Sequence, residues 1–240
     1  RTHQAKKNFL EKFKTVSKER CVFAWVCKAD LPIFINNCIF IRSKMRCMEK
    51  ITFAPNVLLI DAACLNRVGN DMARHFAPLV NRELPKADLS LLLECLALDA
   101  GVQPGENEIQ VIFIYDGSTR RMNFCEPSDL GKELHDVAFK SRLGEFSIYS
   151  FQPSGMASRE DLFIESLRII GESKEAQCVG VVPDEPAYGS KAADEVSKWE
   201  KKDKATLFGM NPPSQLSARW QFEMLGYAVL QSLGIRADEL

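Results

Sequence analysis

The chain has 240 residues, of which 46% are hydrophobic and 26% charged, a composition typical of a globular protein with one sizeable core. It contains no internal repeat, no low-complexity tract and no CxxC pair of the kind that binds zinc. The net charge of −1 conceals two unlike segments: residues 1–47 hold 11 Lys and Arg against 3 Asp and Glu, and the other 193 residues hold 20 against 29. A change of this size indicates a boundary near residue 48.

The basic first segment, residues 1–47, is predicted to be an irregular, cysteine-rich extension. Its apolar stretch, residues 31–41, is too short to span a bilayer, and no signal-peptide pattern is evident. We interpret the segment as sequence outside the native protein, which would begin at Met48 or else at Met45. The alternative is a basic arm that binds nucleic acid. The remainder, residues 48–240, is predicted to be a single domain.

From residue 51 onward, strands alternate with helices. The apolar run 57–60 predicts a strand that is buried on both faces. Two helices are expected next, over 68–80 and 87–100, and the second carries leucines at helical spacing. The run 109–115 predicts a second strand, which ends in the turn signal Asp116-Gly117.

The second half of the chain continues this alternation. Ser158 and Asp161 resemble a capping box at the start of a helix. The expected elements are a short helix at 127–137, a strand at 146–151, a helix at 158–171, a strand at 179–182, a helix at 185–199, a strand at 205–208 and a last helix at 217–233.

This alternation predicts an α/β fold of three layers, with a mainly parallel sheet of five strands covered by helices on both faces. Right-handed crossovers leave few topologies. The favoured order has the first strand in the centre, the second strand on one side of it and the fourth on the other.

Three of the expected strands end in an acid, namely Asp61, Asp116 and Asp184. In an open parallel sheet, ligands bind outside the carboxyl ends of the strands, where the strand order reverses. The three carboxylates are therefore expected to converge on one rim. Clustered carboxylates suit a hard cation, so these acids are the predicted ligands of Mg²⁺ or Mn²⁺.

A metal ion at this rim would lower the pKa of a bound water and neutralise charge on a phosphodiester. Glu185 would orient the water and act with the three acids in catalysis. Arg120 and Arg121 closely follow the second acid and would donate hydrogen bonds to phosphate. The rim therefore predicts metal-dependent phosphoryl chemistry, such as the cleavage of a phosphodiester.

Each acid also has a structural explanation. Asp116 precedes Gly and Ser and would form a turn. Asp184 precedes a helix and would cap it. Asp61 is the hardest to explain in this way, because a carboxylate at the end of a central strand needs a partner or a metal.

The order of strand-Asp, two helices, strand-Tyr-Asp-Gly, strand, helix, strand-Asp, helix and a strand ending in Gly resembles the NYN branch of the PIN-like nucleases, over residues 55–234. The resemblance implies a Rossmann-like sheet and metal-dependent ribonuclease activity. It also implies that Asp61 is the principal acid and Asp184 the acid of the later strand, with Asp116 as a further member.

Two positions depart from the family pattern. Cys64 stands where the family has an Asn, and Asn66, two residues further on, is taken as a substrate-binding residue. Pro186 stands where the family has a second Asp. The loss of these groups, together with the charge of −9 over residues 48–240, favours an alternative: a non-catalytic PIN-like module that binds a protein partner or a small ligand.

A receiver-like small-ligand domain is a third option, but it needs a buried Lys after a late strand, and the fifth strand ends in Phe208-Gly209. No membrane association is expected. A cytoplasmic location fits the acidic composition, the few cysteines and the missing export signal of residues 48–240.

Overall fold

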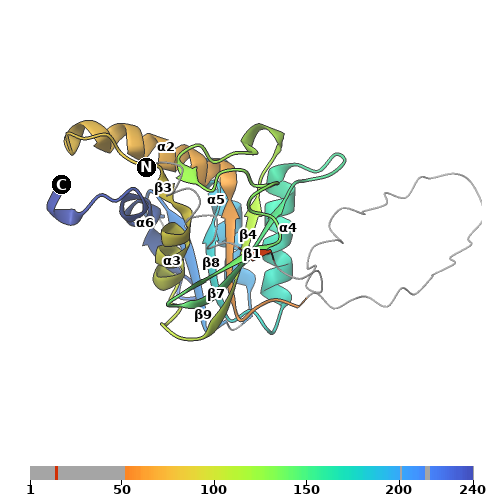
Figure 1. Cartoon of the computed structure of the whole chain (residues 1–240). Coiled ribbons are helices and arrows are strands. Elements are labelled where there is room, and N and C mark those ends of the chain that lie inside the picture. The colour runs from red at the N-terminus through yellow and green to blue at the C-terminus, as the bar shows by residue number, and fades with distance from the viewer. Residues whose placement is uncertain (1–13, 16–51, 201, 214–216, 240) are drawn as a thin grey trace, which may run out of the picture.

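The computed structural model describes residues 14–15, 52–200, 202–213 and 217–239 (Figure 1). The predicted extension lies outside the described residues apart from Lys14–Thr15, and so does its predicted boundary. The strands are β1 (Lys14–Thr15), β2 (Asn56–Asp61), β3 (Ala87–Asp88), β4 (Asn107–Ile114), β5 (Cys125–Glu126), β6 (Val137–Ser141), β7 (Gly144–Phe151), β8 (Cys178–Val182), β9 (Lys204–Gly209) and β10 (Gln221–Met224). The helices are α2 (Ala62–Leu79), α3 (Leu89–Asp99), α4 (Arg159–Glu172), α5 (Glu185–Lys198) and α6 (Leu225–Ser232), with short 3-10 helices η2 (Gly117–Thr119) and η3 (Ala237–Glu239).

The main sheet has the strand order β1-β6-β7-β4-β2-β8-β9-β10. All neighbours from β7 to β10 are parallel, and β6 runs antiparallel to β7. Counted along the chain, the parallel strands therefore read 3-2-1-4-5-6, so the order reverses between β2 and β8. The expected arrangement, with the first strand between the second and the fourth, is confirmed.

A mainly parallel α/β sheet is confirmed, but the expected number of five strands was wrong. Residues 56–224 contribute seven strands to the main sheet, and the two-residue β1 adds an eighth. Within residues 56–224, the sequence analysis missed two strands of the main sheet, β6 and β10. Both are short, and they pair with β7 and β9, respectively. Hydrophobic periodicity over four or five residues does not separate such strands from helices.

Three predicted helices need correction. The segment 127–137 is not a helix but a loop that leads into β6, because Val137–Ser141 pairs with β7. The last helix begins at Leu225 instead of residue 217, because Gln221–Met224 pairs with β9. The first helix begins at residue 62, six residues before its predicted start, because the side chain of Asp61 caps it.

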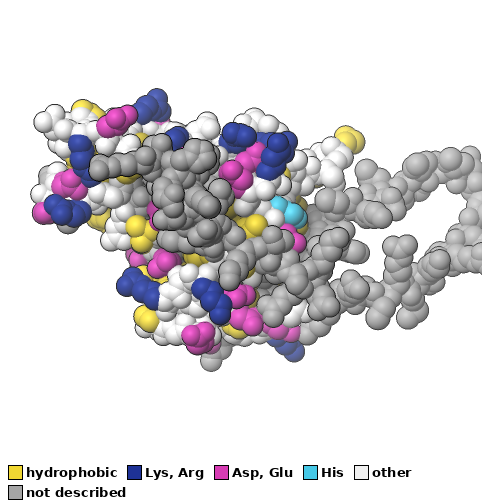
Figure 2. Space-filling view, viewed as in Figure 1, with side chains coloured by type: hydrophobic (Ala, Val, Ile, Leu, Met, Phe, Trp, Pro, Cys, Tyr) yellow, Lys and Arg dark blue, Asp and Glu magenta, His cyan; other side chains and the backbone are white. Residues whose placement is uncertain are grey.

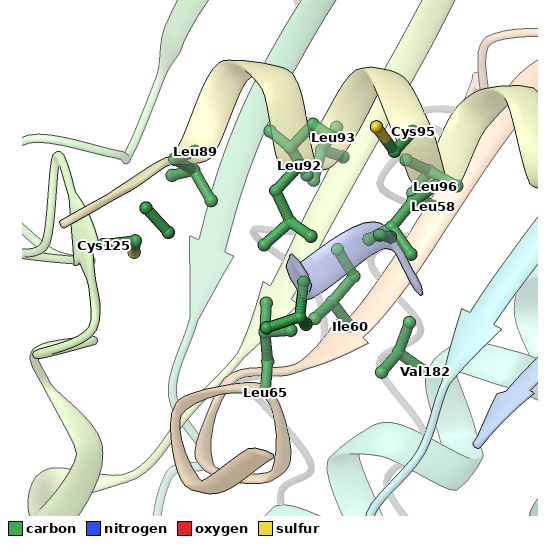
Figure 3. Packing of buried hydrophobic residues seen from close by; sticks show 14 of the residues in the cluster. Leu58, Ile60, Leu65, Leu89, Leu92, Leu93, Cys95, Leu96, Cys125 and Val182 are labelled. Carbon is green, nitrogen blue, oxygen red and sulfur yellow. The ribbon is translucent and has the colours of Figure 1, made fainter. Parts of the chain in front are cut away.

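Two apolar clusters cover the two faces of the sheet. Leu58 and Ile60 of β2 point to one face, which α2, α3 and α6 cover, and Val57 and Leu59 point to the other, which α4 and α5 cover. Figure 1 shows α4 on one side of the strands and α3 and α6 on the other. Figure 3 shows the leucines of α3 above Leu58 and Ile60 of β2. Both faces of the central strand are thus buried, which explains its uninterrupted apolar run.

None of the helices in the described part of the chain is both long and apolar enough to cross a bilayer.

The start of β7 depends on a glycine. Gly144 has φ +124°, and a Cβ built there would lie 2.1 Å from the backbone oxygen of Asn107. Gly155 also has a positive φ, +65°, but a Cβ there would meet nothing within 4 Å. We expect Gly144→Ala to destabilise the protein by more than the about 1 kcal/mol of backbone strain that Gly155→Ala introduces. Urea unfolding of both variants measures the two losses of stability. Equal losses would contradict the conclusion that the start of β7 needs glycine beside Asn107.

Candidate functional site

The carboxyl ends of the parallel strands form the candidate site. Asp61 is the last residue of β2, Asp184 lies two residues after β8, and Asp116 lies two residues after β4. Because β2 and β8 flank the reversal of strand order, Asp61 and Asp184 stand where open α/β sheets bind their ligands. The structure brings all three predicted acids together at this edge.

The centre of this cluster is a guanidinium group, contributed by Arg159 at the start of α4. Its Nε donates to Asp61 Oδ2 at 2.8 Å, its Nη1 donates to Asp116 Oδ2, and its Nη2 donates to Asp184 Oδ2 at 3.1 Å. Each nitrogen therefore binds a different carboxylate, and each carboxylate comes from the end of a different strand. Burial opposes the charge of Arg159, but Asp61 and Asp116 outweigh it and raise the pKa of the guanidinium.

The N-terminus of α4 fixes the position of Arg159. Ser158 and Asp161 form the predicted capping box, with the Ser158 hydroxyl and the Asp161 carboxylate each bonded to the other's backbone N–H. This cap ends the loop after β7 and starts the helix at residue 159. A cation in the first helical turn is disfavoured by the helix dipole. The three carboxylates compensate for that cost.

Asp61 is fully buried, and both of its carboxylate oxygens accept hydrogen bonds. Its Oδ1 accepts the Cys64 N–H at 2.8 Å, which caps α2, and its Oδ2 accepts the Tyr188 hydroxyl as well as Arg159. Burial raises the pKa of Asp61, against the opposing effects of Tyr188, Cys64 and Arg159. Three donors on one carboxylate offset the cost of burying its charge.

Tyr188 reaches Asp61 because α5 is kinked at that residue, where φ is −148° and ψ is 22°. Its ring is buried and packs against Phe163 of α4, with ring centroids 5.3 Å apart. Burial and the neighbouring Asp61 raise the pKa of the Tyr188 hydroxyl. The hydroxyl therefore stays protonated and serves as a hydrogen-bond donor.

The other two acids differ in their surroundings. Asp116 is partly exposed, and its Oδ1 accepts the N–H groups of Ser118 and Thr119, so the expected turn-forming role is real and coexists with the bond to Arg159. Burial alone would raise the pKa of Asp116, but its bonds to Ser118 and the nearby Arg159 hold it below the usual range. Asp184 makes no side-chain cap of α5.

Asp184 instead bridges two arginines. Its Oδ2 accepts Arg159, and its Oδ1 accepts Arg67 Nη2 at 2.7 Å. The same nitrogen of Arg67 lies 3.6 Å from Cys64 Sγ. Three carboxylates and two guanidinium groups thus share this cluster, which leaves one formal negative charge.

The remaining predicted site residues lie outside this cluster. Glu185 accepts the Met210 N–H at 2.7 Å and the Asn211 side chain at 3.2 Å, so it holds the loop after β9. Asn66 accepts the Asn123 N–H at 2.7 Å and joins α2 to the loop after β4. These contacts occupy the side-chain oxygens of Glu185 and Asn66.

Arg120 and Arg121 both pair with a fourth acid. Arg120 Nε lies 3.6 Å from Asp129 Oδ1, and Arg121 Nη2 lies 3.4 Å from Asp129 Oδ2. Asp129 is buried and also accepts the N–H groups of Gly131 and Lys132. The sequence analysis identified the two arginines but not the carboxylate that orients them.

The cluster does not fit a directly bound magnesium ion. With N···O distances of 2.8–3.1 Å and C–N bonds of about 1.3 Å, the oxygens of Asp61 and Asp184 lie up to about 4 Å from the centre of the guanidinium. Magnesium needs oxygens at about 2.0–2.1 Å. Within the described ranges, no three His, Cys, Asp or Glu side chains are arranged to hold one metal ion. The oxygens are also already bonded to Arg159.

The sequence analysis missed Arg159 and Tyr188. One signal for Arg159 was available: a basic residue directly after a capping serine opposes the helix dipole and so needs an acidic partner. Tyr188 carried no such signal, because its contact with Asp61 depends on a local kink in α5.

Replacement of Arg159 is expected to destabilise the protein strongly. Arg159→Gln leaves the buried Asp61 and Asp184 without their shared partner, for which we expect a loss of about 3–5 kcal/mol. The matched control is Arg168→Gln on the same helix, where the arginine pairs with the exposed side chains of Glu165 and Glu172. That change is expected to cost less than about 1 kcal/mol. Urea denaturation measures both, and similar losses would contradict a central role for Arg159.

Asp129 is expected to make the stability of the protein fall in acid. Burial alone would raise its pKa, but the N–H groups of Lys132 and Gly131 and the two arginines hold it below the usual range. The folded state therefore binds this proton less readily than the unfolded chain, so the stabilisation is present above about pH 4 and decreases as the pH falls further. Asp129→Asn should lose less stability between pH 7 and pH 3 than the wild type in urea unfolding. An unchanged pH dependence would refute this.

The comparisons with known proteins give a family. The family model described as a family of unknown function (DUF6621) matches residues 50–240. No curated protein and no solved structure matches the chain. Since the match spans most of the sequence, including every residue of the Arg159 cluster, the chain belongs to the family of unknown function DUF6621.

Proposed function

We propose that this protein is a non-catalytic module that binds a small anionic ligand, such as a phosphate ester, at the carboxyl edge of its sheet. The observation that carries the proposal is the position of Arg159, which already binds the three acids that a metal-dependent nuclease would use. With these carboxylates occupied, the groups that remain available at the rim are arginines.

Three arginines at this edge have guanidinium groups that are both anchored and accessible. The side chains of Arg67, Arg120 and Arg121 are 44%, 53% and 63% exposed, and the acids that anchor them, Asp184 and Asp129, are 7% and 4% exposed. A buried carboxylate lies beside each guanidinium, hydrogen-bonded to that of Arg67 and ion-paired with the other two, and each arginine keeps an exposed portion that faces solvent. Planar N–H pairs of this kind match phosphate and carboxylate oxygens.

The distribution of charge favours a small ligand over a long nucleic acid. Residues 48–240 carry a charge of −9. Among the coloured residues of Figure 2, Lys and Arg side chains are interspersed with Asp and Glu and form no continuous basic stripe. Long nucleic acids usually bind through many phosphate contacts on a basic surface. Three anchored arginines suit one or two phosphate groups.

A metal-dependent ribonuclease is the second candidate. It is favoured by the convergence of Asp61, Asp116 and Asp184 from three strand ends, in the pattern that resembles the NYN nucleases. For this activity Arg159 would have to leave the cluster before a metal ion entered. That requirement, and the use of Glu185 and Asn66 in loop contacts, makes it the weaker candidate.

A cytoplasmic location is part of the proposal. The four cysteines in the described domain, Cys64, Cys95, Cys125 and Cys178, are free thiols. Burial raises the pKa of Cys64 to about 11, which keeps the thiol protonated beside the acidic cluster. Unpaired, protonated thiols suit a reducing compartment.

Ligand binding separates the two candidates. Calorimetric titration with inorganic phosphate and with AMP should give binding that weakens in Arg120→Gln/Arg121→Gln and in Arg67→Gln. The control is Arg142→Gln, an exposed arginine at the opposite end of β7 that pairs with Glu94. Undiminished binding in the rim variants would contradict the proposal.

A nuclease assay completes the test. The wild-type protein should not cleave single-stranded RNA in millimolar Mg²⁺ or Mn²⁺, and these ions should leave its Tm unchanged. Cleavage that is lost in Asp61→Asn would establish the second candidate instead.

A further inference from the structure

We infer that Arg159 is the resident cation of a latent divalent-metal site: the guanidinium excludes Mg²⁺ and Mn²⁺ from the wild-type protein, and a neutral residue at this position opens the cluster to them. This inference goes beyond the proposed function, because it does not require Arg67, Arg120 or Arg121 to bind an anion.

The first support is the way in which the guanidinium is bound. Its three nitrogens donate to three carboxylates that come from the ends of β2, β4 and β8, so it occupies the point on which the acids converge. A small ion placed there would face the same three oxygens. The arrangement is therefore a cation site whose occupant is a side chain of the protein itself.

The second support is the charge that the guanidinium neutralises. Asp61 and Asp184 are 0% and 7% exposed, and Arg67 is the other cation bonded to this cluster among the described residues. Without Arg159, three carboxylates would face one guanidinium, which leaves two formal negative charges in a largely buried site. Uncompensated buried charge is costly, so the cluster would gain strongly from a new cation.

The third support is space and access. A divalent ion at the position of the guanidinium carbon would lie up to about 4 Å from the oxygens of Asp61 and Asp184, a distance that one layer of metal-bound water or a small inward movement spans. Mg²⁺ commonly keeps several of its waters in protein sites. Asp116, whose side chain is 29% exposed, is the most accessible of the three acids to an ion from solvent.

The wild-type protein excludes the ion because its own cation is tethered. The capping box at Ser158 fixes the start of α4, so the guanidinium competes at a high effective concentration. A free ion must also give up part of its hydration to displace it.

The test uses Arg159→Gln, with Arg168→Gln as the control on the same helix. Mn²⁺ binding is followed by the loss of the free Mn²⁺ signal in electron paramagnetic resonance, and folding by the Tm with and without Mn²⁺. Arg159→Gln should bind Mn²⁺ at least about tenfold more tightly than the wild type and should show a higher Tm in its presence. The control should resemble the wild type, and Arg159→Gln/Asp184→Asn should lose the gain.

A second variant covers the case in which Arg159→Gln does not fold. Arg159→Gln/Asp116→Asn removes one charge of each sign and keeps Asp61 and Asp184 as two ligands, so it should fold more readily and bind Mn²⁺ more weakly. A folded Arg159 variant without Mn²⁺ binding would overturn the inference. Failure of both variants to fold even in Mn²⁺ would do the same, because an ion that replaces the guanidinium should restore stability. Phosphate binding by the wild type decides the proposed function separately.

Discussion

A carboxylate at the end of a buried central strand imposes the main constraint on this structure. Asp61 ends β2 with both faces of the strand covered, so its charge has no access to water. Only strong donors offset the cost of burying such a group. The protein supplies them from three elements: the Cys64 N–H of α2, the Tyr188 hydroxyl of α5 and the guanidinium of Arg159 in α4. The need to hydrogen-bond Asp61 thus brings α2, α4 and α5 together at the carboxyl edge of the sheet.

The guanidinium also connects parts of the chain that the sheet alone does not hold together. The start of α4, the loop after β4 and the start of α5 all meet at Arg159, which joins β2, β4 and β8 at the reversal of strand order. In many doubly wound sheets a ligand occupies this crevice. Here a side chain fills its centre, and the groups that we propose for ligand binding are the surrounding arginines, which pair with Asp184 and Asp129.

The same geometry relates the two candidate functions. The acids that would serve a metal-dependent nuclease are present at the strand ends. One oxygen of each, however, accepts a hydrogen bond from Arg159. In our two proposals, a change at Arg159 is therefore what would separate a binding module from a metal site in this fold. The same three bonds of Arg159 compensate the charge of the acids and occupy the oxygens that a metal ion would need.

Much of the fold was determined by local sequence signals. The apolar run before Asp61 and the capping box at Ser158 identified a central strand and the start of α4, and the alternation of elements predicted the parallel sheet and its central strand. Such signals lie within a few neighbouring residues. The outer strands β6 and β10 were not predictable in this way, because their backbones pair with β7 and β9, which only the folded sheet brings alongside them.

The sequence also placed Asp61, Asp116 and Asp184 on one rim, since acids that follow parallel strands must share an edge. It did not show what lies between them. The partner, Arg159, comes from a helix 98 residues after Asp61, and Tyr188 reaches the cluster only through a kink in α5. Contacts of this range depend on helix placement and side-chain direction, so tertiary structure alone decided that the cation at this rim is an arginine.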